Sequence, residues 1–194
     1  MHRVWSMLAA MPPVRRLSTG RVAVEAVAIV DQQGYDTLSV SGVAEALDVA
    51  PSALYTYCDG VAGLRNLVAV QATRNLTREV RDAATGAAGE TALDAMADAY
   101  RSFAARFPGQ FAATLSPPRR DDHDLAEADA DLLDVFVLVY GAMGLDADRS
   151  RSAARSTRSA IHGFVALEHT AAPGSGDDRD YQHLLQTVYA GLVR

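Results

Sequence analysis

The stretch from Thr37 to Leu67 constrains the fold more than any other part of this 194-residue chain. Ser39 is a good N-cap, because its hydroxyl can accept from an unpaired backbone N–H of the first helical turn. An apolar stripe then follows at helical spacing and ends near Leu47. Asp48-Val49-Ala50 predicts a tight turn, since Asp48 tolerates the left-handed conformation that a helix exit often needs. Pro51 starts a new helix without losing a hydrogen bond, so the segment predicts a helix-turn-helix.

The second helix of this motif is short and has two unlike faces. The letters PSALYTYC predict about two turns from Pro51 to Cys58, with Leu54 turned inward. The residues on its outer face are small or carry a hydroxyl group: Ser52, Ala53, Thr56 and Tyr57. Such a surface suits a close approach to base edges and phosphates.

The spacing V-A-x-x-L-x-V-x-x-x-x-L-Y runs from Val43 to Tyr55, and Leu64 follows nine residues later. With the rest of the segment from Leu17 to Leu67, it resembles the N-terminal DNA-binding domain of the tetracycline-repressor (TetR) family. The resemblance implies a short recognition helix and a long helix that links this head to a ligand-binding body. The residues that we expect to bind DNA are Ser41, Ala50, Pro51, Ser52, Ala53, Tyr55, Thr56 and Tyr57.

Three positions depart from the family pattern near the DNA backbone. Asp48 stands where members usually have glycine, Cys58 where they have an aromatic residue and Val61 where a lysine opens the linking helix. Val61 matters most, because it leaves phosphate binding to backbone N–H groups at the helix start and to Arg65. The alternative is a small-molecule-binding or interaction protein of the same fold whose DNA binding is weakened or lost.

The charge distribution also indicates weak attraction between the head and DNA. Residues 1–81 hold 8 Arg and 7 acidic residues, a net charge of +1, whereas residues 82–194 hold 10 Arg and 17 acidic residues, a net charge of −7. A nearly neutral head must attract DNA through the placement of its charges, and a dimer would double its field. One cysteine, Cys58, allows no internal disulfide and suggests a cytoplasmic protein, with the thiol filling the core.

The remaining pattern predicts an all-α chain. We expect a flexible arm over residues 1–16, a DNA-binding head over 17–67 and a ligand-binding and dimerisation domain over 86–194. The run DVFVLVY at residues 134–140 could form a strand by its β-branching, but it continues a helical segment and predicts a buried helix. The expected helices cover residues 19–33, 40–47, 51–58, 60–85, 90–107, 109–115, 122–143, 146–170 and 178–193.

Aromatic residues recur at helical spacing in the body. They are either core residues or the lining of a pocket between helices, and both roles can hold at once. His162 is either a polar pocket group or a core histidine bonded to a backbone carbonyl, and we favour the second. The residues that we expect to contact an effector are Tyr100, Phe103, Phe107, Phe111, Phe136, Tyr140 and His162.

The segment from Tyr100 to Phe111 and the sequence His162-Gly163-Phe164 resemble one C-terminal subgroup of the TetR family. That subgroup has a Trp-x-x-x-His-Gly motif, and Arg158 occupies the Trp position here. The family resemblance implies a homodimer through the helices 146–170 and 178–193. It also implies a repressor that binds a palindromic operator and is released by a small, largely apolar effector. The apolar stripe expected to face the partner consists of Ile161, Phe164, Val165, Leu184, Leu185, Val188 and Leu192.

The sequence offers little for an enzyme, a metal or a membrane. Asp121-Asp122-His123-Asp124 looks like a metal or acid–base cluster, but acidic residues favour a helix start and we interpret the run as solvated. Phosphate loops, nucleophile elbows and Cys-x-x-Cys pairs do not occur in the sequence, so we expect neither catalysis nor a cofactor. The apolar patch in the first residues is too short to span a membrane.

Overall fold

The computed structural model describes residues 16–116, 123–170 and 177–192, and in these ranges the chain is helical without strands. The expected arm at residues 1–16 falls almost wholly outside them, as does the acidic start of the run 121–124. The helices are α1 (Thr19–Gln33), the 3₁₀ turn η1 (Tyr35–Thr37), α2 (Val40–Ala46), α3 (Pro51–Leu54), α4 (Gly60–Ala84), α5 (Gly89–Arg106), α6 (Pro108–Thr114), α7 (His123–Ala142), α8 (Ala147–Thr170) and α9 (Asp178–Leu192). The all-α prediction is confirmed, and so are most of the expected helix bounds.

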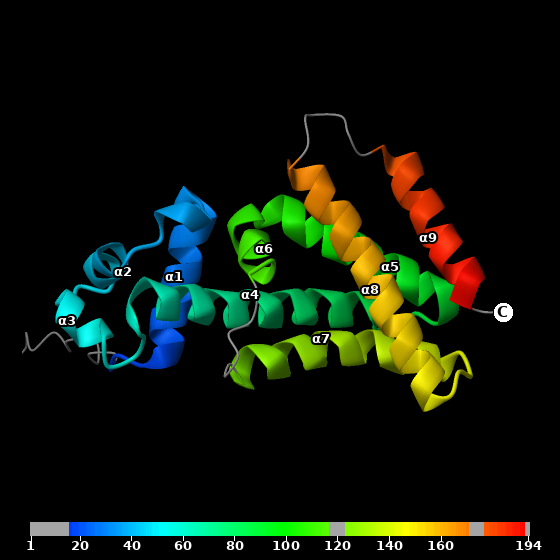
Figure 1. Cartoon of the computed structure of the whole chain (residues 1–194), viewed down its shortest axis with the longest axis horizontal. Coiled ribbons are helices and arrows are strands. Elements are labelled where there is room, and N and C mark those ends of the chain that lie inside the picture. Colours follow the sequence, from blue (N-terminus) through cyan, green and yellow to red (C-terminus); the bar gives the residue numbers. More distant parts are fainter. Residues whose placement is uncertain (1–15, 117–122, 171–176, 193–194) are drawn as a thin grey trace, which may run out of the picture.

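Helix α4 is the axis of the molecule. It has 25 residues and runs from the head, formed by α1 to α3, through the body, formed by α5 to α9 (Figure 1). It packs against α1 and α6 near the head and against α5 and α7 in the body. The linking helix was predicted from the sequence, and the structure shows that it is also the central element of the molecule, because it packs against helices of both the head and the body.

The head has its own apolar core. Leu54 of α3, Val43 of α2 and Leu64 of α4 are fully buried there together with the inner face of α1. Cys58 is buried in the same cluster, so its predicted role as core filler is confirmed. Ala113 of α6 also belongs to this cluster, which means that the body reaches into the core of the head.

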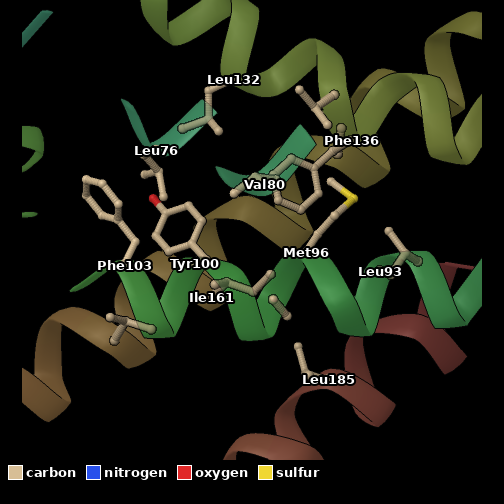
Figure 2. Close-up of a cluster of buried hydrophobic side chains, with 14 of the residues drawn as sticks. Leu76, Val80, Leu93, Met96, Tyr100, Phe103, Leu132, Phe136, Ile161 and Leu185 are labelled. Atoms are coloured by element: carbon tan, nitrogen blue, oxygen red, sulfur yellow. The ribbon is translucent and has the colours of Figure 1, made fainter. Parts of the chain in front are cut away.

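The body core is built around α5 and covered by α4, α7, α8 and α9. Figure 2 shows Tyr100 and Phe103 of α5 facing Leu76 of α4, with Leu132 and Phe136 of α7 beyond them. The run 134–140 lies in α7 and is helical, as predicted. It is not buried on most sides, however, because Leu138 is 73% exposed.

Part of the apolar stripe of α8 and α9 packs inside the body of this chain. Ile161, Val165 and Leu185 are buried in the body core of this one chain, so they are not available to a partner. The expectation that the whole stripe faces a partner is therefore wrong for these three residues. Helical periodicity shows that a face is apolar but does not show which neighbour covers it.

Candidate nucleic-acid interface and body cavities

The helix-turn-helix forms through local interactions. The Ser39 hydroxyl oxygen accepts from the backbone N–H of Gly42 at 3.1 Å, which caps α2. Asp48 is the one non-glycine residue with positive φ (54°) among the described residues, and the N–H of Val49 donates to the carbonyl of Ala44 at 3.0 Å. Pro51 then opens α3 at its first turn. The predicted cap, left-handed turn residue and helix restart are all confirmed.

Helix α3 is shorter than predicted. It covers Pro51–Leu54 and passes into a turn, instead of continuing to Cys58. The turn has a structural cause: the N–H of Tyr57 and that of Cys58 both donate to the carbonyl of Leu54, at 2.8 and 3.0 Å. This arrangement tightens the end of α3 and keeps Cys58 in the core.

Most of the residues predicted to bind DNA are exposed on the head. Tyr55 is 62% exposed, which is unusual for an aromatic side chain in so small a unit. Ala53 is half-buried, and the remaining exposed members are Ser41, Ala50, Pro51, Ser52 and Thr56. Tyr57 differs, because its hydroxyl donates to the carbonyl of Leu17 at 3.1 Å and its ring packs on the head core. Tyr57 thus ties the start of α1 to the turn after α3.

The start of the linking helix has little positive charge to offer. Val61 is 37% exposed at the beginning of α4, where the family resemblance implies a lysine. The Arg65 guanidinium lies over the Tyr35 ring, 5.5 Å from its centroid. Val61 and Arg65 line a hollow of about 360 Å³, and Ser116 of the body lines it too. Arg65 is therefore held towards the head–body junction.

A polar network joins the head to the body at helix α6. The side-chain amide of Gln110 donates to Asp31 of α1 at 2.8 Å, and its oxygen accepts from Asn75 of α4 at 2.6 Å. The other carboxylate oxygen of Asp31 is buried without a hydrogen-bond partner, and burial raises the pKa of this group. At Gly109 the backbones of α6 and α1 touch so closely that a Cβ would overlap the carbonyl of Val30.

The aromatic residues predicted to contact an effector are mostly core. Phe107 is half-buried and, with Phe103, borders a polar hollow of about 440 Å³ beside α4. Five of the seven are at most 1% exposed: Tyr100, Phe103, Phe111, Phe136 and Tyr140. The effector contact therefore stays a prediction for them, and apart from Phe103, which borders that hollow, a ligand reaches them only if the body opens.

His162 is half-buried, but the expected bond to a backbone carbonyl is wrong. Its Nδ1 instead lies 2.6 Å from the hydroxyl oxygen of Tyr100. Burial lowers the pKa of His162, and the nearby Arg158 lowers it further, so the ring is neutral at pH 7. Burial raises the pKa of Tyr100 to about 12, so the phenol keeps its proton. The histidine that does contact carbonyls is His169, whose two ring nitrogens face Val165 and Ala104 at 3.0 and 2.9 Å.

Arg158 occupies the position where the family subgroup has tryptophan. It bonds Asp129 of α7 twice, donating to the side chain at 2.6 Å and to the backbone carbonyl at 3.2 Å. Arg158 and His162 border a hollow of about 370 Å³ between α6, α7 and α8. Of these residues only His162 was predicted from the sequence to contact an effector. The spacing of Arg155, Arg158, Ser159 and His162 on one helical face was a usable signal for the others.

Two further properties concern the described residues only. No group of three or more His, Cys, Asp or Glu side chains among them is placed to hold a metal ion. In the same part of the chain, no helix combines the length and the apolar character that crossing a membrane requires.

The sequence is similar to a known family and to a curated protein. Residues 93–190, half of the chain, match the profile of a family described as tetracyclin repressor-like, C-terminal domain. The chain is 29% identical over 181 residues to the uncharacterised HTH-type transcriptional regulator Rv0681 of Mycobacterium tuberculosis, covering 92% of this chain and 83% of that protein.

Solved structures share the fold over nearly the whole chain. A protein of unknown function from Rhodococcus sp. RHA1 superposes with a TM-score of 0.74 at 20% identity, covering 95% of this chain and all of that one. BioQ, whose structure contains its natural double-stranded DNA operator, superposes with a TM-score of 0.66 at 20% identity, covering 91% of this chain and 98% of BioQ.

Proposed function

Because this chain belongs to the TetR family of transcriptional regulators, we propose that it is a repressor that binds a palindromic operator as a homodimer and releases it when a small effector binds. In this proposal residues 17–67 read DNA, and residues 86–194 bind the effector and dimerise. A protein with this role works in the cytoplasm, where the chromosomal DNA lies. BioQ, which has the same fold, is known with its operator.

The observation that carries the proposal is the exposed surface of α2, the turn and α3. Tyr55 is 62% exposed there, while Leu54 beside it is fully buried. A large exposed aromatic next to small and hydroxyl-bearing residues suits contact with phosphates and base edges. Tyr57 braces this surface through its bond to Leu17 and is the least suited of the eight predicted residues to touch DNA.

Helices α8 and α9 support the homodimer. Leu167 of α8 is 70% exposed, and Phe164, Leu184 and Val188 remain half-buried in the single chain. A second copy related by a twofold axis would cover this apolar surface. Dimerisation also offsets the weak charge of the head, because two heads bound to adjacent half-sites act together. Sedimentation of the purified chain at micromolar concentration tests this part: a monomer would contradict it.

Operator binding is tested with DNA from upstream of the protein's own gene, by fluorescence anisotropy at low and moderate salt. We expect Tyr55→Ala to weaken binding by about tenfold or more, the loss of one good contact. Leu138→Ala is the matched control, because it also removes an exposed apolar side chain but lies on α7 in the body. Absence of sequence-specific binding at both salt concentrations would refute the repressor role.

The alternative, a ligand-binding protein whose DNA binding is weakened or lost, rests on Val61 and on the position of Arg65. Val61→Lys separates the two. If the chain reads DNA weakly, the added lysine should strengthen binding and steepen its salt dependence by about one phosphate contact. If neither form binds any upstream DNA, the alternative holds.

A further inference from the structure

We propose that the hollow between α6, α7 and α8 is a binding site for a small organic carboxylate. This inference rests on the proposed function, since it names the chemical class of the effector and replaces the largely apolar ligand expected from the sequence. The residues that line the hollow are Thr114, Leu133, Arg155, Arg158, Ser159 and His162. Its volume, about 370 Å³, falls at the lower end of the range for small-molecule sites.

Hydrogen-bond donors converge on this hollow. Tyr100 is fully buried, and His162 Nδ1 is the acceptor within reach of its hydroxyl in the described part of the chain. A buried hydroxyl that does not donate leaves its proton unsatisfied, so the phenol donates and the imidazole proton resides on Nε2. That nitrogen has no partner among the described residues, so its N–H is available to a ligand in the hollow.

The charges of the hollow favour an anion with a single charge. The Arg158 guanidinium is already balanced by Asp129 at 2.6 Å, although it keeps further N–H groups for a ligand. Within residues 16–116, 123–170 and 177–192, Arg155 has no ion-pair or hydrogen-bond partner, and His162 is neutral. The described residues of the hollow, taken with Asp129, thus carry a net charge of about +1. A carboxylate matches this charge and the planar donor geometry of a guanidinium, whereas a phosphate dianion exceeds it.

The α6 and α7 residues of the hollow suit the rest of the molecule. Leu133 of α7 supplies an apolar surface, and Thr114 lies at the last turn of α6. The Thr114 hydroxyl donates to the carbonyl of Phe111 at 2.7 Å, so its oxygen is left as an acceptor. Apolar walls with a few placed polar groups are typical of ligand sites. A carboxylate with a short hydrocarbon or aromatic part therefore fits.

The position of the hollow also suits regulation. Thr114 ends the helix whose other end, at Gly109 and Gln110, contacts α1 of the head. A ligand held between α8 and the end of α6 moves the DNA-binding equilibrium only if it binds one position of α6 better than the other. Helix α6 is the element through which such a preference would reach the head.

The site is tested on the purified full chain without DNA. Thermal unfolding is followed with sodium acetate, butyrate, octanoate, benzoate and phenylacetate, with benzamide and phenylacetamide as neutral counterparts and with inorganic phosphate, all at matched ionic strength. Binding to the native state raises the melting temperature. We expect at least one carboxylate to raise the melting temperature, and we expect benzamide and phenylacetamide to raise it less than benzoate and phenylacetate do. Lack of any carboxylate effect, an equal effect of acid and amide, or a stronger effect of phosphate would overturn the assignment.

Variants then locate the binding. For the carboxylate with the largest effect, Arg155→Gln should raise the Kd measured by titration calorimetry by about tenfold or more. Arg151→Gln removes an exposed arginine one turn earlier on α8, outside the hollow, and should leave Kd within about twofold. Equal affinities in the Arg155 variant and the wild type would overturn the site. Operator binding is measured separately without carboxylate, so failure of the site and failure of the repressor role are distinguishable.

Discussion

The contact of Gly109 with α1 gives the sharpest prediction about stability. A Cβ at this position would lie 2.6 Å from the carbonyl carbon of Val30 and nearer still to its oxygen. Both are backbone atoms inside a helix, so no side-chain rotation relieves the overlap, and α1 and α6 must move apart. The movement would also pull Gln110 away from Asp31, whose hydrogen bond is 2.8 Å long.

The magnitude for Gly109→Ala follows from three contributions. Overpacking costs about 1–3 kcal/mol, loss of the hydrogen bond adds about 1 kcal/mol, and the better helix propensity of alanine returns up to about 1 kcal/mol. We expect a net loss of about 2–3 kcal/mol. In a chain of this size that corresponds to a fall of about 5–10 °C in melting temperature.

Urea unfolding followed by circular dichroism, at one protein concentration, measures this loss. Gly20→Ala is the matched control: Gly20 lies in the first turns of α1, and no atom comes within 4 Å of an added Cβ. The control should be neutral or stabilising by up to about 1 kcal/mol. If Gly109→Ala unfolds within about 0.5 kcal/mol of the wild type, the close packing of α6 on α1 is refuted.

Two further predictions concern the body. The buried hydroxyls of Tyr140 and Thr157 lie 2.6 Å apart. Tyr140→Phe should lower the free energy of unfolding in urea by about 1–3 kcal/mol, because it leaves the Thr157 hydroxyl unpaired. Adding Thr157→Val should restore much of this loss, because no unpaired hydroxyl then remains. The Arg101 guanidinium lowers the pKa of Glu168, so the ion pair stabilises the folded state above the unfolded pKa and its contribution is lost as pH falls through the folded pKa. Glu168→Gln should therefore cost about 0.5–1 kcal/mol at pH 7, and its difference from the wild type should shrink below about pH 4.5 in unfolding measured as a function of pH.

The head could be predicted in detail because its signals are local. The cap at Ser39, the left-handed Asp48 and the helix start at Pro51 each depend on residues within four positions. The end of α3 was predicted wrongly, because one of the contacts that stop this helix is distant in sequence. Tyr57 and Cys58 fit a helical pattern in sequence, but the tight turn after Leu54 and the bond from Tyr57 to Leu17, 40 positions away, stop the helix.

The body resisted prediction because its decisive contacts are distant in sequence. Tyr100 and His162 are 62 positions apart, and Asp31 and Gln110 are 79 apart. Helical periodicity marked Tyr100 as inward-facing but could not distinguish a packed core from a ligand wall. The charged face around Arg158 was visible as a spacing, yet only the fold places it beside a hollow that Leu133 of α7 also lines.

Helix α6 is seven residues long, and it contacts both the DNA-binding head and the hollow between α6, α7 and α8. Its first turn is in backbone contact with α1 at Gly109, where a Cβ would overlap Val30, and Thr114 at its other end lines the hollow. Close-packed contacts transmit displacement instead of absorbing it. The weakly charged head adds a reason for such a link: when phosphate contacts are few, a small change in head position removes a large share of the binding energy. If the chain is the repressor that we propose, a small movement of α6 would therefore be enough to release its operator.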